Sequence, residues 1–295
     1  MRVLLLLAAL ALPAAGAYAQ PAENELSVEK ERVLAEIEAQ ASYASPGPAL
    51  KSFSAAGRST ALLRVLEEGI SGRLPGDVGR RRLIDAVWAL GEIGGPGTEP
   101  ALYRALNSAD RTTRLNIAAA LAKLYARAGS GGRKAAAIQD LAAAAAHMEP
   151  GDILFRKGYF GMLNPVIGAQ TVGHVGVYAG MENGEPMVIE GWVPVRKVPL
   201  EKFLSGWPFY GNYTTSPKPG AAQRGLVLKF SEAQIGKVYD YVHTAQKGPL
   251  SFDCVGLAEA AYEYAGLNPT PDDFETGWGW PLTPTEQYEH TVPNF

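Results

Sequence analysis

The strongest constraint on the fold is a change in sequence character at Glu149-Pro150-Gly151. Before this point the chain is rich in alanine, leucine and arginine, and it holds one of the five tryptophans, Trp88. After it come the other four, together with short β-branched runs. Proline followed by glycine ends helices, and 295 residues suffice for two modest domains. We therefore expect a helical domain over residues 20–149 and an α+β domain over residues 150–295.

The first 19 residues have the pattern of a secretory signal peptide. Arg2 precedes a continuous apolar run over residues 3–12, and Ala17 and Ala19 stand where a signal peptidase cleaves. The run is too short to anchor the chain across the ~30 Å hydrocarbon core of a bilayer. We expect cleavage before Gln20 and a periplasmic or secreted protein without a transmembrane anchor.

Composition excludes several other classes of protein. With 47% hydrophobic residues the chain can bury a core, and its net charge of −3 offers no basic field for nucleic acid. Cys254 is the single cysteine, which rules out an internal disulfide and a cysteine-rich zinc site. No cluster of His, Asp and Glu has ligand spacing, so we expect neither a metal nor a cofactor.

The helical half contains two pairs of segments with similar sequences. Residues 61–66 match residues 101–106, and the apolar positions of residues 86–93 match those of residues 117–124. This pattern resembles a pair of HEAT-like helical repeats, with helices expected at 25–42 and 133–147 as caps. Two interpretations are open: a concave surface that binds a protein partner, or an alanine-rich bundle with no binding role.

The second half has strand character first and helical character later. Strands are expected at residues 152–155, 174–178, 187–189 and 226–230. Ser231 is expected to cap a helix that reaches residue 245. A second apolar helix should start at Asp253 or Cys254 and end at Gly266.

Cys254 is a candidate nucleophile because of this position. A thiol at a helix N-terminus lies at the positive end of the helix dipole, which favours the thiolate and predicts a lowered pKa. The backbone N–H of Cys254 itself could hold an oxyanion. The alternative is an inert cysteine buried in an apolar helix, because free cysteine is among the most buried residue types.

A thiolate nucleophile needs a base, and His174 is the best placed of four histidines. It begins a strand between two glycines, Gly173 and Gly176, whereas His243 is expected near a helix end, where a cation is favourable without any catalytic role. The alternative for His174 is an ordinary core or hairpin histidine.

Glu190 is the candidate acceptor that would orient the imidazole. Asn183-Gly184 predicts a hairpin between the two strands. A two-residue turn would place Glu190 on the face opposite His174, whereas a three-residue loop would place both on one face. Glu190 could instead be a solvated strand end, with Asp152 or a backbone carbonyl in the orienting role.

Four short motifs in the second half occur in an order that indicates a known type of fold. They are Gly151-Asp152-Ile153-Leu154-Phe155, Gly173-His174-Val175-Gly176-Val177-Tyr178, Val188-Ile189-Glu190 and Asp253-Cys254-Val255-Gly256-Leu257. They resemble the circularly permuted branch of the NlpC/P60 papain-like superfamily, in particular its YiiX/YebB/YaeF-type group of bacterial envelope proteins. The resemblance covers about 145 residues. Gly173 departs from the pattern, because a serine is common there.

The resemblance implies a papain-like fold with Cys254 as nucleophile, His174 as base and Glu190 as the orienting group. It predicts a cysteine hydrolase of envelope amides or esters, with a peptidoglycan peptide or related amide as the expected substrate. Aromatic side chains are expected to line or flank the substrate cleft, or else to be core: Tyr159, Trp192, Trp207, Trp278 and Trp280.

Two other classes of function are open. Permuted relatives of the lecithin retinol acyltransferase type share the order of His before Cys, which would imply acyl transfer or hydrolysis on a lipid. The third class is an exported binding or scaffold protein in which the papain-like half is inactive.

Overall fold

The computed structural model describes residues 28, 30–32, 35, 56–107, 109–158, 172–241, 243, 246–271 and 281–294. The predicted signal peptide, most of the predicted helix 25–42, and Tyr159, Trp278 and Trp280 lie outside them. In the described part of the chain, no helix is both long enough and apolar enough to cross a membrane.

The first half of the described chain is helical, as predicted. Its helices are α3 Ala56–Ile70, α4 Gly76–Ile93, α5 Thr98–Leu106, α6 Arg111–Arg127 and α7 Gly131–Ala145. The matching sequence segments fall on α3 and α5, and on α4 and α6. Trp88 and Leu121 belong to the apolar core that these helices share. The HEAT-like character of the pairs stays a prediction.

The second half contains a six-stranded antiparallel sheet in the order β4-β3-β2-β1-β5-β8. The strands are β1 Ile153–Arg156, β2 His174–Glu182, β3 Glu185–Glu190, β4 Arg196–Pro199, β5 Phe209–Thr214 and β8 Val292–Pro293. A separate parallel pair consists of β6 Val238–Tyr239 and β7 Ser251–Phe252.

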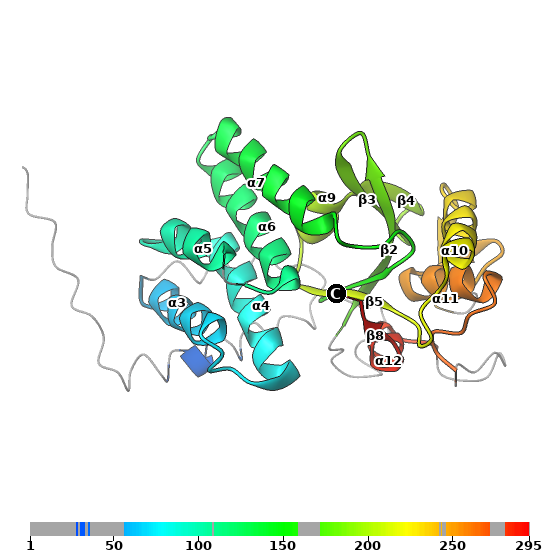
Figure 1. Cartoon of the computed structure of the whole chain (residues 1–295), viewed down its shortest axis with the longest axis horizontal. Coiled ribbons are helices and arrows are strands. Elements are labelled where there is room, and N and C mark those ends of the chain that lie inside the picture. The colour runs from blue at the N-terminus through cyan, green and yellow to red at the C-terminus, as the bar shows by residue number, and fades with distance from the viewer. Residues whose placement is uncertain are drawn as a thin grey trace, which may run out of the picture.

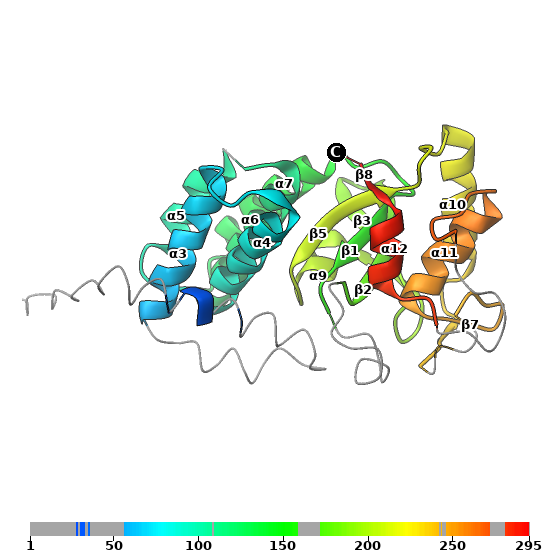
Figure 2. The same ribbon diagram turned by 90° about the horizontal axis from the view of Figure 1, so that it is seen from below.

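Helices cover both faces of the sheet (Figure 1). The remaining helices are α9 Leu200–Leu204, α10 Ala221–Ala233, α11 Cys254–Tyr264 and α12 Pro284–His290. In the perpendicular view the helical half lies on one side of the sheet, and α10, α11 and α12 lie on the other (Figure 2).

The two halves share one hydrophobic core. Leu115 of α6 and Leu141 of α7 belong to the same buried cluster as Leu154 of β1, Val188 of β3 and Phe203 of α9. The helical half therefore supplies the apolar cover for one face of the sheet, which would otherwise meet water. Separating the halves at Pro150 would expose that face.

Polar contacts fix the position of the helical layer on the sheet. The Asn116 side chain accepts a hydrogen bond from the backbone N–H of Phe209 at 2.9 Å and donates to its carbonyl at 2.8 Å. Asp85 of α4 accepts from the hydroxyl of Tyr210 at 3.1 Å and lies 3.4 Å from Nζ of Lys157. All of these groups are buried, so each depends on its partner across the boundary.

The structure corrects the prediction of a strand at residues 226–230. This run lies in α10, and its buried residues are Val227 and Ser231, four positions apart as on one face of a helix. The hydroxyl of Ser231 donates to the carbonyl of Val227 at 2.9 Å, so Ser231 lies inside the helix and does not start one. The expected helix up to residue 245 is wrong: α10 ends at Ala233 and β6 follows.

The shared core and the Asn116 bridge predict a single unfolding unit. Replacing Asn116 with Ala leaves the buried N–H and carbonyl of Phe209 without their partner, so the free energy of unfolding should fall by about 2–4 kcal/mol. Urea unfolding followed by circular dichroism and by tryptophan fluorescence should show one coincident transition shifted to lower urea. Gln139→Ala, an exposed amide of α7, is the control and should cost under about 0.5 kcal/mol. Helical signal that outlasts the tryptophan transition would contradict a shared core.

Candidate active site

Cys254 is the first residue of α11, as predicted. Asp253 is the N-cap, and its Oδ1 accepts from the N–H of Gly256 at 2.7 Å. Gly191, directly after β3, lies against this helix start: a Cβ there would be 2.6 Å from the carbonyl oxygen of Asp253 and 2.8 Å from Cα of Cys254. Only glycine permits this approach, which brings the end of β3 to the start of α11.

The thiol of Cys254 is held by two hydrogen bonds. The β2–β3 ladder ends where Gly176 pairs with Glu190, and the backbone N–H of Val175 donates to the sulfur. The hydroxyl of Tyr239, on β6, forms the second hydrogen bond with the thiol. The sulfur therefore lies at the backbone of the residue adjacent to His174.

The electrostatic environment of the thiol is the reverse of the predicted one. Burial, and after it the neighbouring Asp253 carboxyl, raise the pKa of Cys254 to about 12, against the lowering effects of Val175, Arg156 and Tyr239. The helix start was expected to lower this pKa. The loss of water around the sulfur outweighs the helix dipole, because the side chain is buried.

Glu190 reaches the face of His174 through a register shift. The hairpin has the two-residue turn that would have separated them, since Glu182 pairs with Glu185. An irregularity between Tyr178 and Gly180 then moves the register by one, so that Glu190 pairs with Gly176. A bulge inserts one extra residue and reverses the alternation beyond it. His174 and Glu190 therefore share a face, although the three-residue loop proposed for this purpose is absent.

His174 and Glu190 form a buried hydrogen-bonded pair. Nε2 of His174 lies 2.7 Å from Oε2 of Glu190, and Oε1 of Glu190 accepts from Nε of Arg196 at 2.8 Å. The Trp192 ring packs edge-on against His174 at 5.4 Å between centroids and lies 5.0 Å from the guanidinium carbon of Arg196. Trp192 thus lies beside the pair and is 40% exposed, and its role in substrate binding stays a prediction.

These contacts set the protonation of the pair. Burial, then Arg156, lowers the pKa of His174 to about 4, so the imidazole is neutral at neutral pH. The pKa of Glu190 falls to about 2 because His174, Arg156 and Arg196 outweigh the opposing effect of burial. An ionised carboxylate only accepts hydrogen bonds, so Nε2 carries the proton and Nδ1 carries the lone pair. Among the described residues Nδ1 has no hydrogen-bond partner.

The geometry brings the candidate nucleophile and base to one end of the sheet. The sulfur binds the backbone beside His174, and the imidazole presents an available lone pair. A direct hydrogen bond between the thiol and the ring is not among the contacts of the described residues. The catalytic pairing of Cys254 with His174 therefore stays a prediction.

Other predicted site residues lie elsewhere. Asp152, the substitute for Glu190, is fully buried and accepts from Arg224, Asn212 and Asn294 at 2.7–2.8 Å, so it does not orient His174. The Trp207 ring stacks on Trp88 of α4, with ring centroids 6.2 Å apart, so it contacts the helical half. Its role in substrate binding stays a prediction, as do those of Tyr159, Trp278 and Trp280 outside the described residues.

The sequence patterns did not predict a second buried hydrogen-bond network, which surrounds the carboxylate of Asp253. Oδ2 of Asp253 lies 2.7 Å from Nδ1 of His243 and accepts from Nε2 of Gln246 at 2.5 Å. His243 was expected in a helix, but it has a φ of 54° and lies outside any helix. These contacts fix the N-cap and hence Cys254. The one sequence signal for this network was Asp253, directly before Cys254.

Gly173, the departure from the family pattern, has a structural reason. A Cβ at this position would lie 1.9 Å from the carbonyl oxygen of Gly158. The backbone directly before His174 therefore passes too close to Gly158 for a serine to fit there without movement.

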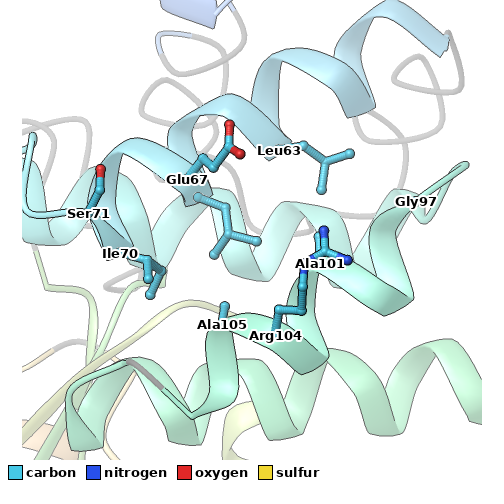
Figure 3. A pocket seen from close by; sticks show the side chains of 9 residues that line it. Leu63, Glu67, Ile70, Ser71, Gly97, Ala101, Arg104 and Ala105 are labelled. Carbon is cyan, nitrogen blue, oxygen red and sulfur yellow. The ribbon is translucent and has the colours of Figure 1, made fainter.

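A separate cavity lies in the helical half, between α3 and α5 (Figure 3). Its volume is about 480 Å³, Glu67 and Arg104 are its charged residues, and the apolar lining includes Leu63, Leu66, Ile70, Ala101 and Ala105. Figures 1 and 2 place these helices on the side of the molecule away from α11. A partner for the helical half stays a prediction.

Three comparisons with known proteins bear on this site. Residues 147–271 match the family described as permuted papain-like amidase enzyme, YaeF/YiiX, C92 family. A crystal structure described as metalloprotein yiiX from Escherichia coli O157:H7 is 20% identical, with 42% of this chain and 70% of that chain covered and a TM-score of 0.35. No curated protein matches the chain. The family match supports a permuted papain-like domain in the second half.

The described residues contain no group of three or more His, Cys, Asp and Glu side chains that could hold a metal ion.

The pKa shifts predict an acid-sensitive fold. Both His174 and Glu190 have lowered pKa values, so the unfolded chain binds more protons than the folded one, and stability falls with pH. Unfolding free energy should decline as pH falls from 6.5 to about 4 through His174, by on the order of 3 kcal/mol. Urea unfolding across this range, compared with His174→Gln, should show the decline flattened in the variant. An equal decline in both proteins would contradict the lowered pKa of His174.

The raised pKa of Cys254 predicts a slow thiol. With a pKa of about 12, roughly one molecule in 10⁵ carries a thiolate at pH 7, against a few per cent for an ordinary cysteine. Iodoacetamide should therefore label the folded protein on the order of 10³-fold more slowly than the urea-unfolded protein, with mass spectrometry as the readout. Because the chain has one cysteine, every adduct reports on it. Rapid labelling of the folded protein at pH 6 would restore the original expectation of an activated thiolate.

Proposed function

We propose that this protein is a cysteine-dependent amide hydrolase of the bacterial cell envelope, with Cys254 as nucleophile, His174 as base and Glu190 as the group that orients His174. One observation carries the proposal: the 2.7 Å bond from Nε2 of His174 to Glu190 leaves the Nδ1 lone pair on a ring whose neighbouring N–H binds the Cys254 sulfur. The match of residues 147–271 to an amidase family supports the same chemistry.

The first step follows from two neutral partners. A buried thiol and a buried imidazole are both uncharged at rest, so the proton passes from sulfur to Nδ1 as the sulfur attacks the amide carbonyl. The ion pair then exists only while the reaction proceeds, and ionised Glu190 stabilises the imidazolium formed. The neutral pair of the resting enzyme avoids the cost of burying two charges before substrate arrives.

The start of α11 offers donors for the developing oxyanion. Among the described residues, the backbone N–H groups of Cys254 and Val255 have no hydrogen-bond partners, whereas that of Gly256 is taken by Asp253. They are the unsatisfied donors of a helix N-terminus, beside the sulfur. Imidazolium at His174 next protonates the leaving amine, and the neutral ring then activates the water that hydrolyses the thioester.

The substrate and location belong to the same proposal. The signal pattern of residues 1–19 supports export, and a peptidoglycan peptide or related envelope amide fits an exported amidase. A permuted papain-like site also fits acyl lipids, which is why the screen must include them. The helical half, which shares the core of the sheet, would position the site and could recruit a partner.

The proposal predicts which side chains turnover requires. Cys254→Ala should abolish hydrolysis of muropeptides, and Glu190→Gln should lower kcat about 10²–10⁴-fold, because the glutamine no longer stabilises the imidazolium. Product release is measured by liquid chromatography and mass spectrometry, with Gln139→Ala as the control for handling and folding. Unchanged turnover by Cys254→Ala with a native circular dichroism spectrum would end the cysteine mechanism. Turnover of acyl lipids in place of muropeptides would assign the same site to lipid chemistry.

A further inference from the structure

Two buried cations follow each other at the end of β1, and they differ in their partners. Lys157 is 4% exposed, and its Nζ lies 3.4 Å from a carboxylate oxygen of Asp85. Arg156 is 6% exposed, and in the described part of the chain it has no carboxylate within 4.0 Å. In the same part of the chain its Nη1 donates a long hydrogen bond to the carbonyl of Lys157 at 3.3 Å, and its Nε has no partner.

An arrangement of this kind calls for an anion. A guanidinium has five N–H donors, and Arg156 is attracted by the Glu190 carboxylate only at a distance, without a carboxylate hydrogen-bonded to it. A buried cation without such a directly bound counter-charge costs free energy. The Phe203 ring, 5.1 Å from the guanidinium carbon, contributes only a weak attraction. With a pKa lowered by burial only to about 10, Arg156 stays charged at neutral pH.

Arg156 lies next to His174 in the candidate active site. Arg156 pairs with His174 across the β1–β2 ladder, and the His174 ring contacts the same Phe203 ring at 5.7 Å between centroids. Both oxygens of Glu190 are already engaged, one by His174 and one by Arg196. One carboxylate among two arginines and a neutral imidazole leaves this group of side chains with a net positive charge.

We propose that Arg156 binds the carboxylate of the leaving group, so that the substrate is an amide whose amine component is an amino acid with a free carboxylate. The inference rests on the proposed function, because His174 protonates the departing nitrogen and so fixes the side of the leaving group. In an α-amino acid the carboxylate is attached to the carbon next to that nitrogen. A guanidinium binds such a group with paired, charge-assisted hydrogen bonds.

The reaction balances without a co-reactant other than water. The Cys254 sulfur bonds to the carbonyl carbon, the carbon–nitrogen bond breaks, and the thiol proton passes through His174 to the nitrogen. The free amino acid leaves with its carboxylate intact. Water then adds to the thioester, releasing a carboxylic acid and restoring the thiol.

A matched pair of substrates tests the proposal. Dansyl-alanyl-alanine and dansyl-alanyl-alaninamide differ only in the terminal carboxylate. The wild-type kcat/KM should favour the carboxylate by about tenfold or more. Arg156→Met should reduce this ratio to about 1, and Arg156→Lys should give an intermediate ratio. Arg133→Gln, an exposed arginine of α7, should leave the ratio unchanged.

A second measurement separates this inference from the proposed function. Fluorescence polarisation of the same two compounds with Cys254→Ala should show preferential binding of the carboxylate, and Arg156→Met in that background should abolish the preference. If neither compound is hydrolysed but this binding pattern holds, the hydrolase proposal fails and the anion site stands. A ratio near 1 in the wild type, or an unchanged preference without Arg156, would overturn the inference while hydrolysis by Cys254 stands.

Arg156→Met also distinguishes ligand binding from a structural role. Removing an unpaired buried charge should leave the melting temperature unchanged or raise it. A marked fall in melting temperature, with the substrate ratio preserved in Arg156→Lys and Arg156→Met alike, would show that the arginine only supports Glu190.

Discussion

The hydrogen bond between His174 and Glu190 is the interaction on which the candidate site depends. It sets the tautomer of the His174 ring. Together with Arg196, which binds the other oxygen, it keeps the buried Glu190 carboxylate ionised. A single register shift in β2 makes the bond geometrically available. Without that shift, Glu190 would project from the opposite face of the sheet, and the imidazole would lack its orienting anion.

At neutral pH both the Cys254 thiol and the His174 imidazole are uncharged. Burial opposes charge on both groups, and the helix start that was expected to create a thiolate is too weak to overcome the loss of water. The start of α11 still supplies an N-cap held by His243 and Gln246. It also supplies backbone N–H groups beside the sulfur that have no partner among the described residues. In the proposed mechanism, charge is therefore generated only during the attack of the sulfur, and Glu190 stabilises the imidazolium that forms.

Sequence patterns predicted the features that depend on local chemistry. The start of α11 at Asp253-Cys254, the Asn183-Gly184 hairpin and the helical first half all follow from capping, turn and periodicity rules. They missed what depends on tertiary contact. Residues 226–230 form a helix in which only one side of the run is buried. The bulge in β2 has no local signal, and the pairing of His243 with Asp253 has no signal other than the aspartate directly before Cys254. The contact between the halves was equally invisible, because composition carries no signal that Leu115 and Phe203 lie in one cluster.

The most direct test of the central claim is intact-protein mass spectrometry during the first turnover of an activated acyl substrate. The account predicts that an acyl adduct accumulates on Cys254 in the wild type, and that His174→Gln forms the same adduct at least about 10²-fold more slowly. An adduct that forms equally fast without His174, or turnover of substrate with no adduct on Cys254, would contradict it.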